Sequence, residues 1–233
     1  MNTHRLVITL NRLGKLPLTR DEEVSLLWRL LRGWEEERHD NSVKYYCWNM
    51  TGAEGTPLYS LVFSAVDTKI TAAVWQAAEG LKAKGSGIEV VGGSVWTILS
   101  VMPVEDFPYL GEAVSLISTS GMLSHRKQRR EGRRSYQTFF LNNPASVGEW
   151  IKQMQQRLAR RTNDFFGTDY APEDVLIDKA KHIATETVMY KGGKRLAQFV
   201  RLKIRAPREV LVMAIYGGIG TSTGSGFGMV TIC

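Results

Sequence analysis

Cysteine is scarce in this chain: the 233 residues include two, Cys47 and Cys233. Two cysteines cannot form the set of disulfides that stabilises small secreted domains, and they lack the paired spacing of a structural zinc site. No cluster of His, Cys, Asp and Glu shows metal-ligand spacing either. We therefore expect no metal and no other cofactor, and a reducing, cytoplasmic environment.

Long apolar runs are also missing from the sequence. None approaches the roughly 20 residues of a membrane-spanning helix, and residues 4–10 have the pattern of a β-strand rather than of a signal peptide. We therefore expect no membrane partner. Hydrophobic residues nevertheless make up 43% of the chain, which is enough to form a folded core.

Acidic residues are outnumbered by basic ones, 23 against 30, so the formal net charge is +7. Such an excess favours a polyanionic partner. It is densest at residues 126–134, and the helix expected after this run is basic as well. A solvated loop or a targeting signal would have the same composition. We predict RNA backbone contacts from Arg126, Lys127, Arg129, Arg130, Arg133, Arg134, Arg157, Arg160 and Arg161.

Six of the twelve residues at 217–228 are glycine, with threonine and serine between them. Backbone N–H groups and hydroxyls of such a loop can bind phosphate. Nucleotide-binding loops run strand, glycines, helix, whereas this one is expected to run helix, glycines, strand and contains no Gly-Lys-Ser/Thr. A polymer backbone is therefore favoured over a mononucleotide, and a packed turn is the alternative without a ligand.

The expected elements repeat one order, β-α-β-β-α-β, in the two halves of the chain. This predicts an α+β fold with tandem ferredoxin-like (RRM-like) domains at 1–104 and 105–233. In the first half we expect strands at 4–10, 43–48, 58–63, 88–91 and 95–99, and helices at 19–38 and 68–81. In the second we expect helices at 111–122, 147–158 and 207–216, and strands at 136–141, 175–190, 197–204 and 230–232.

A family resemblance rests on Gly218-Ile-Gly220, five intervening residues, and Gly226-Phe-Gly-Met229. This pattern resembles the C-terminal glycine-rich signature of RAMP proteins, and its place in the chain is similar to that in CRISPR repeat-processing endoribonucleases. The resemblance implies a CRISPR repeat stem-loop as ligand, metal-independent cleavage, and retention of the mature guide RNA, with other effector-complex subunits as further partners. The basic run resembles the helical finger of type IV members, which implies a basic helical insertion.

The five residues between the paired glycines, Thr-Ser-Thr-Gly-Ser, carry no charge, although family loops often contain a basic residue there. Phosphate contact by this loop would therefore come from backbone N–H groups and hydroxyls. The predicted loop contacts are Gly218, Gly220, Ser222, Gly226 and Gly228.

Metal-free RNA cleavage requires an aligned 2′-hydroxyl, a group that removes its proton, and stabilisation of charge on the phosphorane. The family usually places a histidine near the first helix, and His39 follows that helix here, with Arg38, Lys44 and Tyr45 close by. We predict these four as catalytic residues, although 38–40 would equally suit a solvated helix end. His4, His125 and His182 are weaker candidates. The outer face of the helix supplies predicted RNA contacts at Arg20, Arg29 and Arg32, which are also substitute electrostatic catalysts.

Three functions are compatible with these features. The first is a metal-independent endoribonuclease that uses the 2′-hydroxyl as nucleophile and leaves a cyclic phosphate. The second is a non-catalytic RAMP-type subunit that holds guide RNA in an effector complex, which the neutral loop and the lack of a clear His/Lys/Tyr triad favour. The third is an unrelated tandem RRM-like protein, which lacks the aromatic consensus of that class.

Overall fold

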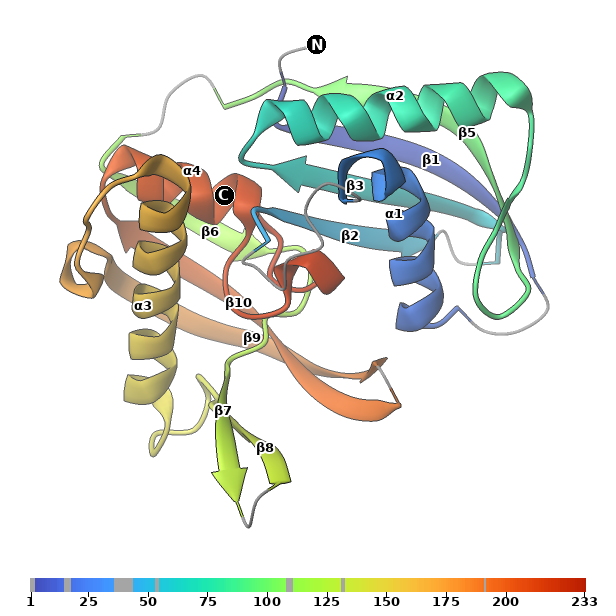
Figure 1. Ribbon diagram of the computed structural model, residues 1–233. Coiled ribbons are helices and arrows are strands. Elements are labelled where there is room, and N and C mark those ends of the chain that lie inside the picture. Colours follow the sequence, from blue (N-terminus) through green and yellow to red (C-terminus); the bar gives the residue numbers. More distant parts are fainter. Residues whose placement is uncertain are drawn as a thin grey trace.

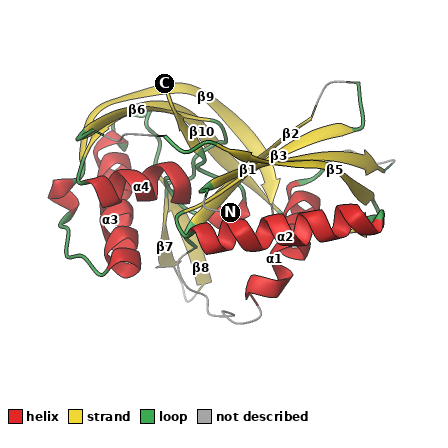
Figure 2. Ribbon diagram, turned by 90° about the horizontal axis from the view of Figure 1, so that it is seen from above, coloured by secondary structure: helices red, strands yellow, loops and turns green. Residues whose placement is uncertain are grey.

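The structure of this protein, a computed structural model, describes residues 3–14, 18–35, 44–52, 55–107, 111–130, 133–190 and 192–233. Its strands form two main antiparallel sheets and one separate hairpin. Figure 1 shows the sheets side by side, with the hairpin projecting from the second. Figure 2 shows that the helices lie on the same side of both sheets.

The first sheet has the strand order β2-β3-β1-β5-β4. The helices α1 and α2 are amphipathic, and their apolar side chains pack with those of the sheet in one core. Asp67 accepts a hydrogen bond from Lys69 N at 2.8 Å at the start of α2, and Gly85 ends the helix in a left-handed conformation. The elements are β1 (Arg5–Leu13), α1 (Arg20–Glu35), β2 (Tyr46–Gly52), β3 (Leu58–Ala65), α2 (Thr68–Lys84), β4 (Ile88–Glu89) and β5 (Val95–Val104).

The second sheet has the order β11-β6-β10-β9, and α3 and α4 pack against it. In both sheets the first and third strands of the β-α-β-β-α-β unit are central, so the predicted tandem ferredoxin-like arrangement is confirmed. The second unit begins with β6, however, and not with the strand predicted at 136–141. The elements are β6 (Ala113–Ser118), α3 (Val147–Phe166), β9 (Leu176–Tyr190), β10 (Gly193–Arg205), α4 (Arg208–Gly217) and β11 (Val230–Ile232). Two short 3₁₀ helices are η1 (Pro172–Asp174) and η2 (Thr223–Ser225).

The predicted helix at 111–122 is wrong. Residues 113–118 form β6, the strand between β11 and β10. In the sequence Ala-Val-Ser-Leu-Ile-Ser, Val114, Leu116 and Ser118 are buried, and the residues between them are more exposed. This two-residue period belongs to a strand with one buried face.

The predicted basic helical insertion is also wrong. The basic run forms a hairpin, in which β7 (His125–Arg130) pairs with β8 (Arg133–Thr138) and Arg130 lies opposite Arg133. The likeness to a helical finger, and the type IV subtype inferred from it, therefore receives no support from this segment.

Two large cores hold the molecule together, one under each sheet, and a smaller cluster joins elements of the second half to α1. Strands of the first sheet end at Val104, and strands of the second begin at Ala113. We retain domains at 1–104 and 105–233 as a proposal on this basis.

Candidate nucleic-acid interface

The glycine-rich loop at 217–228 runs from the end of α4 to β11 and is largely buried. On one side, the indole N–H of Trp48 in β2 donates a hydrogen bond to Gly224 O at 3.2 Å. On the other, Thr221 N donates to Leu123 O at 2.9 Å, just before the hairpin. The loop therefore lies between the first sheet and the start of the hairpin.

The positive φ angles and tight surroundings of this loop require glycine at two positions in particular. Gly226 has φ of +81°, and a Cβ there would lie 2.6 Å from Arg20 Nη1. Gly228 has φ of +75°, and its Cβ would lie 1.8 Å from Ile219 O. Protein packing thus explains these glycines without RNA, and the contacts predicted for Gly218, Gly220, Gly226 and Gly228 remain predictions. Ser222 is the exposed residue of the loop, and its RNA contact is a prediction as well.

A buried arginine on α3 holds the start of the loop. Arg161 is 5% exposed and donates to the carbonyl oxygens of Gly218 and Gly217, both at 2.6 Å. It also donates to Lys44 O at 2.7 Å, which joins α3 to the residues before β2. Burial lowers the pKa of Arg161 to about 10. The direct RNA contact predicted for Arg161 does not agree with this enclosed position, because its guanidinium is buried and donates to the protein.

Arg20 lies between the aromatic rings of Trp48 and Phe227, with Cζ 5.3 Å from each centroid. Its Nη1 forms an ion pair with Glu23 Oε2 at 2.7 Å, and both side chains are nearly buried. This sandwich connects α1 to β2 and to the loop. The predicted RNA contact from Arg20 does not agree with this enclosed position.

Glu23 has an unusual environment for a carboxylate. Its burial raises the pKa to about 7, the charge of Arg20 opposes that rise, and Glu22 and Glu186 add to it. The group therefore changes charge near neutral pH at a point beside the glycine-rich loop.

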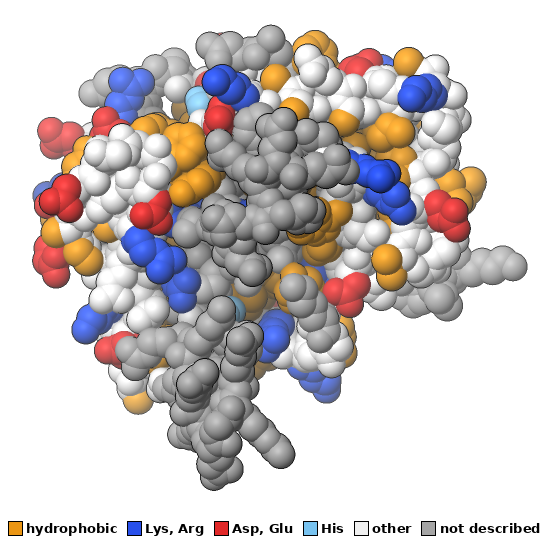
Figure 3. All heavy atoms as spheres, in the orientation of Figure 1, with side chains coloured by type: hydrophobic (Ala, Val, Ile, Leu, Met, Phe, Trp, Pro, Cys, Tyr) orange, Lys and Arg blue, Asp and Glu red, His pale blue; other side chains and the backbone are white. Residues whose placement is uncertain are grey.

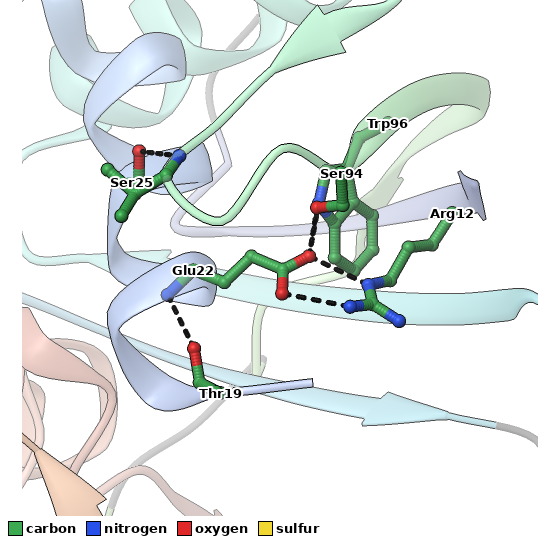
Figure 4. Close-up of polar contacts among 7 residues, drawn as sticks. Arg12, Thr19, Glu22, Ser25, Ser94 and Trp96 are labelled. Atoms are coloured by element: carbon green, nitrogen blue, oxygen red, sulfur yellow. Dashed lines mark hydrogen bonds and ion pairs between the residues drawn. The ribbon is translucent and has the colours of Figure 1, made fainter. Parts of the chain in front are cut away.

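Glu22 anchors the start of α1 to the first sheet (Figure 4). Its carboxylate accepts from Arg12 Nε at 2.7 Å, from the indole N–H of Trp96 at 3.1 Å, and from the Ser94 hydroxyl. Burial alone would raise the pKa of Glu22, but these bonds and the Arg12 charge together lower it. At the start of α1, Thr19 Oγ1 accepts a hydrogen bond from Glu22 N at 3.3 Å, while the Glu22 side chain turns to the sheet.

The predicted catalytic residues are only partly described. Arg38 and His39 lie outside the described residues. Lys44 lies beside the glycine-rich loop, because a Cβ on Gly224 would be 2.9 Å from Lys44 Cγ. Tyr45 packs on Phe165, with ring centroids 4.9 Å apart, at the edge of the second core. The catalytic role of all four residues remains a prediction.

The outer face of α1 exposes Trp28, Arg29 and Arg32. Lys44 Nζ lies 5.6 Å from the centroid of the Trp28 ring, so positive charge and an exposed aromatic surface occur together there. Such a combination suits phosphate contact and base stacking. Arg29 and Arg32 remain predicted RNA contacts.

On the second half, Arg160 is exposed on α3, and Arg157 Nη2 donates to His125 O at 2.7 Å at the base of the hairpin. The hairpin places Arg129 opposite Arg134 and Arg130 opposite Arg133 in the backbone ladder. Figure 3 shows lysine and arginine side chains on both sides of the residues drawn in grey. RNA contacts from the hairpin, Arg157 and Arg160 remain predictions.

Two of the weaker histidine candidates have local partners. The ring of His4 stacks on Tyr216 with centroids 4.4 Å apart, and His182 Nε2 lies 2.8 Å from Thr185 Oγ1. In the part of the chain that the structure describes, no group of three His, Cys, Asp or Glu residues has the arrangement of a metal site. Across the same residues, no helix has the length and apolar character needed to cross a membrane.

The second half of the chain matches a known protein family. Residues 106–232, more than half of the chain and including the glycine-rich loop, match the family model described as "CRISPR associated protein Cas6, C-terminal". The chain belongs to the Cas6 family. The predicted resemblance to CRISPR repeat-processing RAMP proteins is thereby confirmed, whereas the type IV subtype is not.

Solved structures agree with the Cas6 fold. A Cas6-related protein from Pyrococcus furiosus is 12% identical with a TM-score of 0.75, and 99% of this chain and 98% of that one are covered. A structure described as a RAMP protein binding different RNA substrates has 14% identity, a TM-score of 0.77 and 99% coverage of both chains. A Cas6 product complex has 14% identity and a TM-score of 0.72, covering 99% of this chain and 100% of that one. A search of curated protein sequences found no match.

The buried positions of Arg161 and Glu23 are not evident from the sequence. Both follow the helical charge pattern of surface residues, and only the packing of α3 and α1 against distant segments buries them. Arg161 lies about one helix turn after Leu158, and Glu23 about one turn before Leu27, so each shares a helix face with an apolar residue. That position alone does not distinguish a buried charge from an exposed one.

Proposed function

We propose that this Cas6-family chain is an endoribonuclease that binds a CRISPR repeat stem-loop, cleaves precursor RNA to mature guide RNA, and remains bound to the product. The observation that carries this proposal is the family match over residues 106–232, which includes the glycine-rich loop. Further support is the whole-length likeness to a Cas6 product complex and to a CRISPR endoribonuclease bound to a 19-nucleotide RNA, the latter with a TM-score of 0.54.

The proposed chemistry is transesterification within the RNA. The 2′-hydroxyl attacks the adjacent phosphorus, a base takes its proton, and the departing 5′-oxygen receives a proton, which leaves a 2′,3′-cyclic phosphate and a 5′-hydroxyl end. His39 is the proposed acid or base, since an imidazole suits proton transfer at neutral pH. Lys44 supplies positive charge beside the glycine-rich loop, where it would stabilise the phosphorane. No step in this scheme uses a metal ion.

A non-catalytic guide-RNA-binding subunit is the alternative. Two observations favour it: the loop carries no charge, and its glycines are explained by contacts with the protein itself. In that case the loop supports the fold and the RNA surface, and the chain binds the repeat without cutting it.

The experiment is incubation of the purified chain with its cognate repeat RNA in excess EDTA, with cleavage and binding measured in parallel. We expect cleavage in EDTA, slowed about 10²–10⁴-fold by His39→Ala with binding retained. His182→Ala is the matched control and should cleave at the unaltered rate. Tight binding without cleavage in any condition would support the non-catalytic alternative, and cleavage that depends on added magnesium would contradict the metal-free chemistry.

A further inference from the structure

The second sheet has one side that none of the described helices covers. Its other side packs against α3 and α4 (Figure 2). Along β10, the buried residues Val200, Leu202 and Ile204 alternate with exposed residues that are all basic. Those exposed residues are Arg201, Lys203 and Arg205. Because successive side chains of a strand point to opposite sides, these basic residues lie on the side away from the helices, which we call the open face.

The pairing of β9 with β10 adds two more positive charges to the open face. Lys181 lies directly opposite Arg201, and Lys179 lies directly opposite Lys203. Both lysines are exposed. Neighbouring strands are about 5 Å apart, and residues two apart on one strand are about 7 Å apart. The four side chains, which we call the basic quartet, therefore start from one small area of the sheet.

Acidic side chains do not balance the basic quartet. In the part of the chain that the structure describes, no member of the quartet has an ion pair or a side-chain hydrogen bond. Asp178 pairs with Arg205 instead, at 3.1 Å, and Glu112 lies beyond Arg205, where its carbonyl oxygen accepts from Ala206 N. Like charges on directly opposite residues destabilise a sheet. The quartet therefore lowers the stability of the free protein, and an anionic ligand would offset that cost.

Apolar side chains border the quartet on the open face. Phe199 precedes Arg201 by two residues on β10, and Ile117 of β6 lies opposite Arg201 on its other side. Both are partly exposed, and neither belongs to the three apolar clusters of the described chain. An aromatic ring beside a row of cations suits single-stranded RNA, because bases stack on the ring while phosphates meet the charges. An acidic protein surface would use the charges but not the ring.

The open face is separate from the other predicted RNA contacts. The helices α1 and α3, which carry several of those contacts, lie on the opposite side of the sheets (Figure 2). A stem bound on the helix side leaves the open face for unpaired nucleotides of the same RNA. We propose that the open face of the second sheet binds the single-stranded part of the repeat RNA, through the basic quartet and Phe199. We take the RNA from the proposed function, on which this inference rests.

The test compares the repeat stem-loop alone with the same stem-loop carrying its single-stranded flanks. A 2′-deoxynucleotide at the cleavage position prevents cutting in both. The charge variant is Lys181→Gln with Lys203→Gln, and its control is Lys69→Gln with Lys84→Gln, which removes two charges from α2. All four lysines are exposed, so neither double variant threatens the fold. Phe199→Leu removes the ring, and Phe199→Tyr retains it.

We expect the charge variant to bind the flanked RNA about tenfold or more weakly than its control, the range of hydrogen bonds to charged groups. Its log–log salt slope should fall by about 0.7 for each lost contact with a single strand. Phe199→Leu should bind the flanked RNA about fivefold or more weakly, and Phe199→Tyr as the wild type does, because base stacking needs an aromatic ring. All these proteins should bind the stem-loop alone equally.

Three other results would overturn the inference. If the wild type binds both RNAs tightly and the charge variant matches its control, the open face does not contact RNA; an acidic protein surface then becomes its alternative ligand, and the proposed function stands. Equal weakening for the two RNAs would mean that the quartet contacts the stem and not the flanks. If the wild type binds neither RNA, the proposed function fails and the single-strand surface fails with it.

Discussion

Replacing Arg161 with alanine should destabilise the protein strongly, because this side chain donates to three carbonyl oxygens that belong to two distant segments. A buried acceptor that loses its donor costs about 1–3 kcal/mol. The hydrogen bonds to the carbonyls of Gly217 and Gly218 are buried, and the one to Lys44 is partly buried. The substitution also removes the cost of burying the guanidinium charge, which offsets part of the loss. We therefore expect a net loss of about 3 kcal/mol.

The assay is thermal unfolding followed by circular dichroism. For a chain of this length, about 3 kcal/mol corresponds to a melting temperature about 6–12 °C lower. Arg160→Ala is the matched control, since it removes the same charge from the preceding, exposed position of α3. Its free energy of unfolding should stay within about 0.5 kcal/mol of the wild-type value. Arg161→Lys should fall between the two, because one ammonium cannot reproduce the geometry of the guanidinium fork. A melting temperature of Arg161→Ala within about 2 °C of that of Arg160→Ala would show that the three carbonyl bonds of Arg161 do not stabilise the fold.

Three further predictions concern the loop, the buried carboxylate and the hairpin. Gly226→Ala should unfold at a lower temperature and bind repeat RNA more weakly than Gly93→Ala, because both have positive φ but only the first meets other atoms; equal behaviour would contradict the packing argument. The pKa of Glu23 in the folded state is about 7, against an ordinary value of 4.5. The protonated carboxyl should therefore stabilise the fold fully below about pH 4.5, and this stabilisation, about 3 kcal/mol, should be lost as the pH rises through 7. Urea unfolding of Glu23→Gln between pH 5 and 8 should show a flatter dependence than the wild type, and identical curves would refute this assignment. Alanine at Arg129, Arg130, Arg133 and Arg134 should weaken repeat binding and lower its salt slope by about 0.7–0.9 per lost contact, and an unchanged slope would exclude the hairpin as an RNA contact.

Elements with a clear period were predictable from the sequence. The helices α1 and α2, and the long hairpin of β9 and β10, were all predicted, because their apolar spacing or alternation continues over several turns or pairs. The glycine-rich loop was placed correctly between a helix and a strand. β6 was missed because a six-residue strand of small and apolar side chains differs little from a short helix in local composition.

The candidate site was less predictable. Positive charge along the sequence indicated an anionic partner, but it did not separate arginines that face solvent from those that bind carbonyls. Arg160 and Arg161 are adjacent and chemically identical, yet one is exposed and the other is 5% exposed. That difference depends on where α4 ends relative to α3, which is a property of the tertiary fold.

Cleavage by an internal 2′-hydroxyl depends on a single oxygen atom of the substrate, and one substitution in the RNA removes it. A repeat RNA with a single 2′-deoxynucleotide on the 5′ side of the scissile phosphate is compared with the all-ribose RNA, in EDTA, with binding and cleavage both measured. We expect equal binding of the two RNAs and cleavage of the all-ribose RNA alone, with a cyclic phosphate end. Cleavage of the deoxy-substituted RNA at the same bond would contradict the 2′-hydroxyl mechanism.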